Sequence, residues 1–340
     1  MKFIQRVPDA EELKQMFPLT KEQRENRQKI ISELKAILAG SNKKKMICIG
    51  PCSADREDAV LEYMERLVKL QERVVDRFVL VPRIYTSKPR TSGTGYKGLL
   101  HRPESVGKTD DLYHGIIATR KMHLHIIQQT GMFGADEMLY PEAHNYISDL
   151  LSYTAVGARS VENQQHRMVA SGLDMPVGMK NPTGGDMEVM LNAIVAAQNQ
   201  QALLYHGWEC HTEGNPYSHA ILRGFVDSAG RNHSNYHYDN LCDLHDAYQK
   251  KNLSNISVVI DCNHSNSRKR YDAQIRIAKE IKNMCMQDKD MDGFVKGLMI
   301  ESYLEDGCQM IGNGIYGKSI TDPCLGWDKT ERLILDLYQM

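Results

Sequence analysis

No stretch of this sequence is apolar over the length that a membrane-spanning helix needs, and residues 1–13 contain no apolar segment typical of a secretory signal. An excess of charge is also lacking, because 42 basic and 43 acidic residues give a formal net charge of −1, and there is no basic tail. A general nucleic-acid-binding protein usually carries a clear positive excess. We therefore expect a cytoplasmic protein that has neither a membrane nor a nucleic acid as its partner.

The sequence also lacks the cysteine pattern of a small secreted domain that disulfides hold together. Its eight cysteines are scattered over 340 residues, at positions 48, 52, 210, 242, 262, 285, 308 and 324. Neither internal repeats nor low-complexity tracts are present. With 41% hydrophobic and 25% charged residues, the composition is that of an ordinary globular protein. We expect a reducing compartment, in which the cysteines are free thiols or metal ligands.

Two regions of the chain differ in character. Residues 1–45 have a charged pattern that predicts an N-terminal helical extension, whereas residues 46–340 alternate short apolar runs with longer helical patterns, such as Asp55–Val74 and Tyr271–Met286. The expected strands are Met46–Gly50, Phe78–Arg83, Met132–Asp136, Ala155–Arg159, Pro176–Lys180, Ala202–Tyr205, Ser257–Asp261 and Gly297–Glu301.

Eight apolar strands separated by helices predict a parallel sheet that is covered on both faces. At this strand number and chain length, the sheet is expected to close into a catalytic (β/α)8 barrel, the TIM-barrel fold, over residues 46–340. The polar segments 84–113 and 206–240 are too long for simple connections, so we expect functional loops or small hairpins there.

Charged or metal-binding residues repeatedly follow the expected strands. Barrel enzymes place their chemistry at the C-terminal ends of the strands. Taken singly, each residue has an ordinary explanation, such as a buried cysteine, a structural histidine or a solvated basic side chain. Seven of them at matching strand ends favour an active site, and they are Cys52, Arg83, Glu137, Arg159, Lys180, His264 and Glu301.

A local excess of positive charge occurs between Arg77 and Pro103, where six basic residues occur and no acidic residue does. Together with the glycine-rich stretch Ser92–Gly95, this pattern suits the binding of phosphate or carboxylate groups. The alternatives are a solvated basic loop or an RNA-binding patch. RNA is the weaker option, because only Tyr85 and Tyr96 are available there as stacking aromatics.

Four ionisable residues form a candidate metal site with sulfur, nitrogen and oxygen donors: Cys52, His264, Glu301 and Asp322. This donor set suits a borderline divalent transition metal better than Mg²⁺ or Ca²⁺, which prefer oxygen alone. The four residues are far apart in the sequence, so no local spacing motif supports the site.

Seven short segments, which follow one another over nearly the whole chain, carry a family resemblance. They are Ile49–Ser53, Lys88–Thr91, Gly157–Arg159, Pro176–Asn181, Ile221–Gly224, His264–Ser267 and Gly317–Asp322. With these segments, the sequence resembles the class I 3-deoxy-D-arabino-heptulosonate 7-phosphate (DAHP) synthases, of the type of the aromatic-feedback-regulated enterobacterial enzymes. The resemblance implies a (β/α)8 barrel with an N-terminal extension and a small inserted hairpin, assembled as a homodimer or homotetramer.

The resemblance also implies a reaction, in which phosphoenolpyruvate, D-erythrose 4-phosphate and water give DAHP and phosphate. This is the first step of the shikimate pathway of aromatic amino acid biosynthesis. A divalent metal (Mn²⁺, Fe²⁺, Co²⁺ or Zn²⁺) is expected on Cys52, His264, Glu301 and Asp322. The residues expected to hold phosphoenolpyruvate are Arg83, Lys88, Arg159, Lys180 and Arg223, with Glu137 and Lys97 nearby.

The implied catalytic residues are Lys88, Cys52 and His264. Lys88 is the candidate proton donor to the new alkoxide, with a water molecule on the metal as the alternative. Arg90 and Thr91 are expected to bind the phosphate of the aldose.

The sequence departs from the family pattern at several positions. Cys262 and Asn263 replace the usual residues before His264, and Pro182–Gly185 forms a reordered loop. The inserted hairpin is expected to be reduced to His206–Thr212, and Asp174 stands where relatives carry a small polar residue. We therefore expect a lost or altered site for an aromatic amino acid effector.

Three alternatives remain at this point. The related 3-deoxy-D-manno-octulosonate 8-phosphate synthases share the chemistry but differ in the aldose loop. A paralogue in secondary metabolism could use a modified tetrose phosphate. A catalytically silent, phosphate-binding regulatory protein is the third alternative, although all four expected metal ligands are present.

Overall fold

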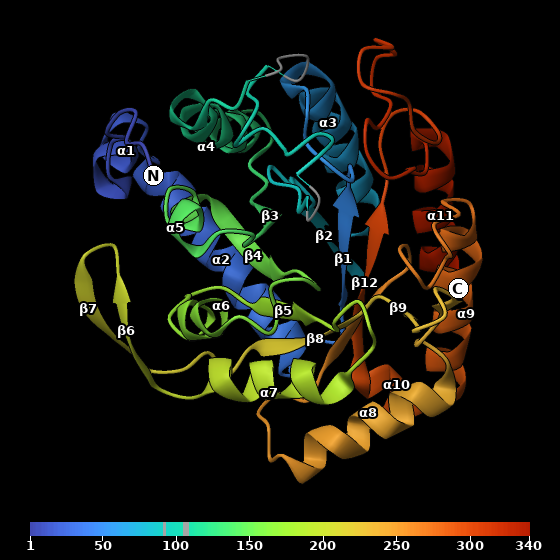
Figure 1. Cartoon of the computed structure of the whole chain (residues 1–340). Coiled ribbons are helices and arrows are strands. Elements are labelled where there is room, and N and C mark those ends of the chain that lie inside the picture. Colours follow the sequence, from blue (N-terminus) through green and yellow to red (C-terminus); the bar gives the residue numbers. More distant parts are fainter. Residues whose placement is uncertain (91–92, 105–108) are drawn as a thin grey trace.

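A parallel sheet of eight strands forms a nearly closed barrel in the computed structural model, which describes residues 1–90, 93–104 and 109–340 (Figure 1). The strands follow one another around the barrel in the order β2-β1-β12-β11-β8-β5-β4-β3. Their bounds are β1 (Lys45–Gly50), β2 (Phe78–Pro82), β3 (Gly134–Glu137), β4 (Leu151–Val156), β5 (Val177–Lys180), β8 (Ser218–Leu222), β11 (Val258–Asp261) and β12 (Val295–Glu301). The expected (β/α)8 barrel is therefore confirmed.

Helices surround the barrel and cover the outer faces of its strands. They are α3 (Glu57–Val74), α4 (Leu112–Thr130), α5 (Pro141–His144), α6 (Gln164–Ala170), α7 (Met187–Gln198), α8 (Tyr238–Lys250), α9 (Ala273–Gln287), α10 (Lys289–Phe294) and α11 (Trp327–Gln339), with a short 3-10 turn at Ser148–Leu150. No helix in the described part of the chain is both long and apolar enough to cross a membrane.

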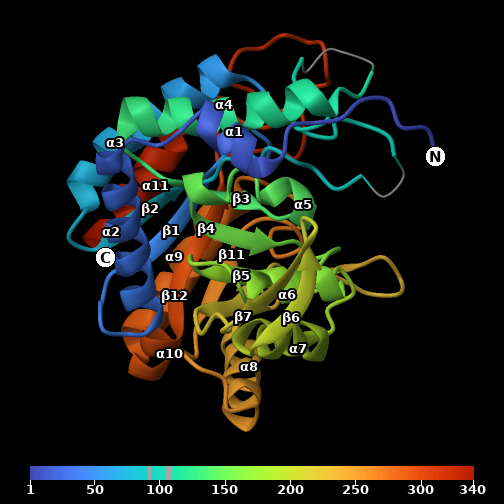
Figure 2. The ribbon, with the colours of Figure 1, turned by 90° about the vertical axis from the view of Figure 1, so that its left-hand side faces the viewer.

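Two further helices, α1 (Ala10–Met16) and α2 (Lys21–Leu38), precede the barrel. Thr20 caps α2, because its side chain accepts from Gln23 N while the Gln23 side chain accepts from Thr20 N. Leu34 and Ile37 of α2 are fully buried against inward-facing side chains of the barrel such as Met46 and Tyr153. Each such side chain contributes roughly 1.5–3 kcal/mol by its burial. Figure 2 shows that α2 thereby closes the end from which the strands begin.

The prediction that Ala202–Tyr205 is a strand of the barrel is wrong. This segment is β6 (Gln201–Tyr205), which pairs antiparallel with β7 (Trp208–Thr212) in a hairpin that stands away from the barrel (Figure 1). Its side chains are partly exposed, and Leu204 is 80% exposed, so the segment lacks the two-sided burial of a barrel strand. The hairpin is accordingly longer than the expected His206–Thr212.

The sixth barrel strand is β8, which lies inside the segment 206–240 that the sequence indicated as a loop. The polar residues Ser218 and His219 hid this strand. His219 is fully buried, yet Tyr153 Oη lies 2.8 Å from its Nε2 atom and Tyr217 O lies 2.9 Å from its Nδ1 atom. Burial lowers the pKa of His219 to about 4, so a neutral ring occupies the barrel interior at pH 7.

The fourth strand is also displaced from its expected place, because β4 begins four residues before the expected Ala155. Buried polar side chains again hid its start. Ser152 Oγ donates to Phe133 O at 2.6 Å, and Thr154 Oγ1 lies 2.9 Å from His144 Nε2. Because these side chains have hydrogen-bond partners, they can be buried at little cost.

Candidate active site

A solvent-open cavity of about 360 Å³ lies at the C-terminal ends of the barrel strands. Most of the residues that the sequence indicated for substrate binding line it: Arg83, Lys88, Arg90, Glu137, Arg159, Lys180 and Arg223. Lys97 does not line this cavity, because its ammonium group pairs with Asp110. Thr91 lies outside the described residues. Strand ends that are far apart in the sequence thus bring many cationic groups together.

The candidate metal ligands Cys52, Glu301 and Asp322 lie beside this cavity, and one donor atom from each lies within 4.8 Å of the other two. Cys52 follows β1, Glu301 is the last residue of β12, and Asp322 lies in the loop before α11. The ring of His264 is close, because its Nε2 atom is 3.8 Å from Glu301 Oε1. One sulfur, one nitrogen and two carboxylate donors fit a divalent transition metal.

Lys88 reaches the same place from the loop that follows β2. Its Nζ atom lies 2.9 Å from Cys52 Sγ and donates to Cys52 O at 2.9 Å. Burial, reinforced by Glu301, raises the pKa of the Cys52 thiol to about 11. Burial by itself would lower the pKa of Lys88, but the electrostatic effects of Cys52, Glu301 and Asp322 outweigh it and the pKa is raised. Lys88 is therefore an ammonium group at neutral pH.

Glu301 is held from both sides. Arg83 Nη2 lies 2.8 Å from its Oε1 atom, and Asn263 Nδ2 donates to its Oε2 atom at 2.6 Å. Burial acts to raise the pKa of Glu301, but the electrostatic effects of Arg83, His264 and Lys88 outweigh it, so the pKa is lowered. Glu301 is therefore a carboxylate although it is fully buried.

Asp261, the last residue of β11, was not recognised as a site residue in the sequence. Its Oδ2 atom lies 3.0 Å from Lys180 Nζ and 2.9 Å from His264 Nδ1. Despite full burial, the neighbouring His264 and Lys180 hold the pKa of Asp261 well below its usual range. The Nδ1 atom of His264 thus lies against Asp261 while its Nε2 atom lies toward Glu301, the arrangement in which a carboxylate stands behind a metal-binding histidine. Its only signal in the sequence was its place at a strand end.

Arg223 directly follows β8, so it too lies at a strand end. The resemblance indicated Arg223 as a substrate-binding residue, but no strand was expected before it. The side chain is buried, and its Nη1 atom has no hydrogen-bond partner among the described residues. Burial lowers the pKa of Arg223, and the guanidinium group still carries its charge. A buried donor without a partner is costly unless a ligand completes it, so this atom points to an anion in the cavity.

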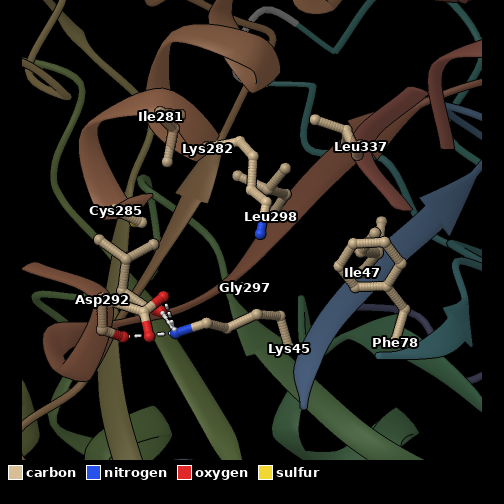
Figure 3. A pocket seen from close by; sticks show the side chains of 11 residues that line it. Lys45, Ile47, Phe78, Ile281, Lys282, Cys285, Asp292, Gly297, Leu298 and Leu337 are labelled. Atoms are coloured by element: carbon tan, nitrogen blue, oxygen red, sulfur yellow. Dashed lines mark hydrogen bonds and ion pairs between the residues drawn. The ribbon is translucent and has the colours of Figure 1, made fainter. Parts of the chain in front are cut away.

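A second cavity lies at the opposite end of the barrel, between β1, β12 and α9 (Figure 3). Its polar groups are Lys45, Lys282 and Asp292, and Lys45 Nζ lies 2.9 Å from Asp292 Oδ1. Its volume of about 40 Å³ has room for about one water molecule. This cavity is therefore far smaller than the one at the C-terminal ends of the strands.

Comparisons with known proteins agree with this geometry. The Trp-sensitive phospho-2-dehydro-3-deoxyheptonate aldolase of Escherichia coli O157:H7 is 37% identical over 314 residues, which cover 88% of this chain and 85% of that protein. The Tyr-sensitive enzyme of E. coli strain K12 is 35% identical over 344 residues, covering 97% and 91%. The solved structure of a phospho-2-dehydro-3-deoxyheptonate aldolase from Francisella tularensis SCHU S4 is similar with a TM-score of 0.92 and 30% identity, covering 100% of this chain and 98% of that one.

The match to a family is equally extensive, because residues 17–334 match the DAHP synthetase I family. The chain belongs to the DAHP synthetase I family.

Proposed function

We propose that this protein condenses phosphoenolpyruvate with D-erythrose 4-phosphate and water to give DAHP and inorganic phosphate, the first step of the shikimate pathway. The observation that carries the proposal is the juxtaposition, at one cavity, of the Cys52, Glu301 and Asp322 cluster with Arg223, whose Nη1 atom has no partner among the described residues. Both substrates carry several negative charges, so their encounter requires fixed cations. Arginine groups suit phosphate and carboxylate because they bind them in a bidentate manner.

The reaction forms one carbon–carbon bond and one carbon–oxygen bond and breaks another carbon–oxygen bond, and in net terms the two protons of water pass to the new alkoxide and to the departing phosphate. C3 of phosphoenolpyruvate attacks the aldehyde carbon of erythrose 4-phosphate, and the oxygen of water adds to C2. The bond between C2 and the phosphate oxygen then breaks, and the new alkoxide takes up a proton. Arg159, Lys180 and Arg223 hold phosphoenolpyruvate, and holding two reactants in register removes roughly 7–11 kcal/mol from a bimolecular barrier.

Lys88 is the group that we propose as the proton donor, from its Nζ atom. It lines the substrate cavity and lies beside Cys52, so it can face the reacting carbonyl oxygen and the metal site together. Arg83 and Glu137 line the same cavity, and the charge of Arg83 acts on phosphoenolpyruvate there while its Nη2 atom holds Glu301.

We assign Cys52, His264, Glu301 and Asp322 as the ligands of the metal, with Mn²⁺, Fe²⁺, Co²⁺ or Zn²⁺ as the ion. A bound divalent cation supplies Lewis-acid chemistry at a carbonyl oxygen. The chain contributes the surroundings of the ligands, because Asp261 lies against His264 Nδ1 while Arg83 and Asn263 hold Glu301.

The aldose phosphate is assigned to Arg90 and Thr91, of which Arg90 lines the cavity from the loop after β2. This assignment favours a four-carbon aldose phosphate over the five-carbon substrate of 3-deoxy-D-manno-octulosonate 8-phosphate synthases. A modified tetrose phosphate is the second candidate, and a silent phosphate-binding protein the third. Release of phosphate from phosphoenolpyruvate with erythrose 4-phosphate, arabinose 5-phosphate or no aldose distinguishes them, and no release with any aldose contradicts the proposal.

Three further expectations are part of the proposal. They are a homodimeric or homotetrameric assembly, a cytoplasmic location, and a division into an extension (1–45) and a catalytic barrel (46–340). Light scattering of the purified protein tests the first. A monomer with full activity would contradict it.

A further inference from the structure

The barrel has a weak seam between β2 and β3, its first and last strands in the order around the sheet. Among the described residues, one backbone bridge joins them, between Arg83 and Ala135, and Ile84 N donates to Ala135 O at 2.9 Å. On the N-terminal side of this bridge, a cavity of about 450 Å³ is lined by residues 79–82 and 130–133 of the two sides. Backbone pairing therefore closes the seam only near its catalytic end.

A side chain continues this closure beyond the backbone bridge. Asp136, in β3, is 1% exposed. Its Oδ1 atom accepts from Thr86 N at 3.1 Å and from Glu137 N at 2.7 Å, and its Oδ2 atom accepts from Thr86 Oγ1 at 2.5 Å. His123 Nε2 lies 3.4 Å from Oδ2 on the outer side. One buried carboxylate thus ties the chain after β2 to the end of β3.

Thr86 is the base of the loop that carries Lys88. Thr86 O accepts from Leu100 N at 3.2 Å, and Lys88 N donates to Lys97 O at 3.0 Å, so the two ends of the loop are joined there. Gly98 packs against the same group, because a Cβ atom at Gly98 would lie 2.4 Å from Thr86 O. The position of Lys88 therefore depends on where Thr86 is held.

Glu137, which lines the substrate cavity, directly follows Asp136. The carboxylate consequently contacts both segments that present site residues at this seam, one leading to Lys88 and one to Glu137. A hydrogen bond to a charged, buried acceptor is stronger than a neutral one, so this tie is a strong local constraint.

We propose that Asp136 is a positioning residue for the condensation, which closes the β2–β3 seam at the catalytic end and thereby fixes Lys88 against the metal site. The inference rests on the proposed function for its kinetic effect, whereas its structural part, the hold on residues 86–88, stands by itself. Asp136 touches no reacting atom and acts through Thr86.

The test combines kinetics with amide hydrogen exchange in the whole protein. Thr86→Val removes the hydroxyl donor but keeps the shape of the side chain, and Thr86→Ser restores the donor. Thr86→Val should lower kcat about tenfold with less than about threefold change in the KM for phosphoenolpyruvate, and Thr86→Ser should stay within about twofold of the parent. In Asp136→Ala, exchange at the amides of Thr86, Lys88 and Leu100 should rise at least about tenfold.

Ser152→Ala is the matched control, because Ser152 Oγ donates to Phe133 O at the other end of the same region and is likewise buried. It should lower Tm and leave kcat unchanged. Equal losses of kcat in Ser152→Ala and Thr86→Val would overturn the proposal, and so would unchanged exchange at residues 86–88 in Asp136→Ala. A parent protein that turns over no aldose would contradict the proposed function, and amide exchange would still decide the role of Asp136.

Discussion

The Nζ atom of Lys88 lies 2.9 Å from the Sγ atom of Cys52, so the proposed proton donor and a proposed metal ligand are in contact. Lys88 comes from the loop after β2 and Cys52 from the loop after β1, and both residues are buried. This contact joins the candidate metal site to the substrate cavity, because Lys88 also lines that cavity.

Replacement of this lysine provides the first prediction. Lys88→Met keeps the apolar stem and removes the ammonium group, so kcat should fall by about 10²–10⁴, the usual contribution of a general acid. Titration of the variant with Mn²⁺ should still show binding, because the four ligands are intact. A Lys88→Met variant with kcat within about threefold of the parent would show that another group delivers the proton.

Asp55 gives a prediction on stability. Its carboxyl is mostly buried and its Oδ1 atom has no hydrogen-bond partner among the described residues. Burial raises its pKa from 3.8 to about 6. Since the folded protein binds this proton more tightly than the unfolded chain, the group lowers stability progressively as pH rises from about 4 to 6, and the cost remains above that range.

Asp55→Asn should therefore raise the free energy of unfolding by about 3 kcal/mol at pH 7.5 and by much less at pH 4, since one pKa unit corresponds to about 1.4 kcal/mol. Denaturant unfolding at both pH values measures it. Glu72→Gln, on the exposed side of α3, is the control and should change little at either pH. An equal effect of Asp55→Asn at the two pH values would disprove the explanation by burial.

Arg90 tests how the two substrates are assigned. Arg90→Ala should raise the KM for erythrose 4-phosphate about 10- to 100-fold, because a hydrogen bond to a charged group contributes roughly 1.5–3 kcal/mol. The KM for phosphoenolpyruvate should change far less. Steady-state kinetics with each substrate varied in turn give both values, and equal effects would mean that Arg90 binds a different group.

Control by aromatic amino acids is the fourth prediction. Asp174, a residue that could hold the ammonium group of an effector, already pairs with Arg27 of α2 at 2.7 and 2.8 Å. Desolvation acts to raise the pKa of Asp174, but hydrogen bonding to Arg27 outweighs it and lowers the pKa. We therefore expect weak inhibition, if any, by phenylalanine. Dose–response curves with phenylalanine, tyrosine and tryptophan measure this, and strong inhibition by phenylalanine would contradict it.

Strand patterns in the sequence were sufficient to predict the fold, but not every strand. Apolar runs such as those of β1 and β12 are buried on both faces, so the sequence shows them directly. Ser218 and His219 of β8 are polar yet buried, and the hydrogen bonds that allow the burial of the His219 ring form only in the tertiary structure. The half-exposed β6 was therefore mistaken for the sixth barrel strand.

The sequence likewise predicted some residues of the site and missed others. Cys52, Glu301 and Asp322 come from three distant parts of the chain, and the family resemblance indicated them together where spacing could not. Asp261 and Asp136 contact other side chains of the site, so apart from their places near strand ends nothing in the sequence distinguishes them from ordinary strand residues. Their contacts appear only when the barrel brings the strand ends together.

The most direct test of the account is phosphate release from phosphoenolpyruvate and erythrose 4-phosphate, measured before and after removal of metal. We expect turnover that a chelator abolishes and that Mn²⁺, Co²⁺ or Fe²⁺ restores better than Ca²⁺, because the donors include sulfur and nitrogen. His264→Ala should remain folded and fail to recover activity with any of these ions. Full activity in the metal-free protein, or in His264→Ala, would contradict the central claim.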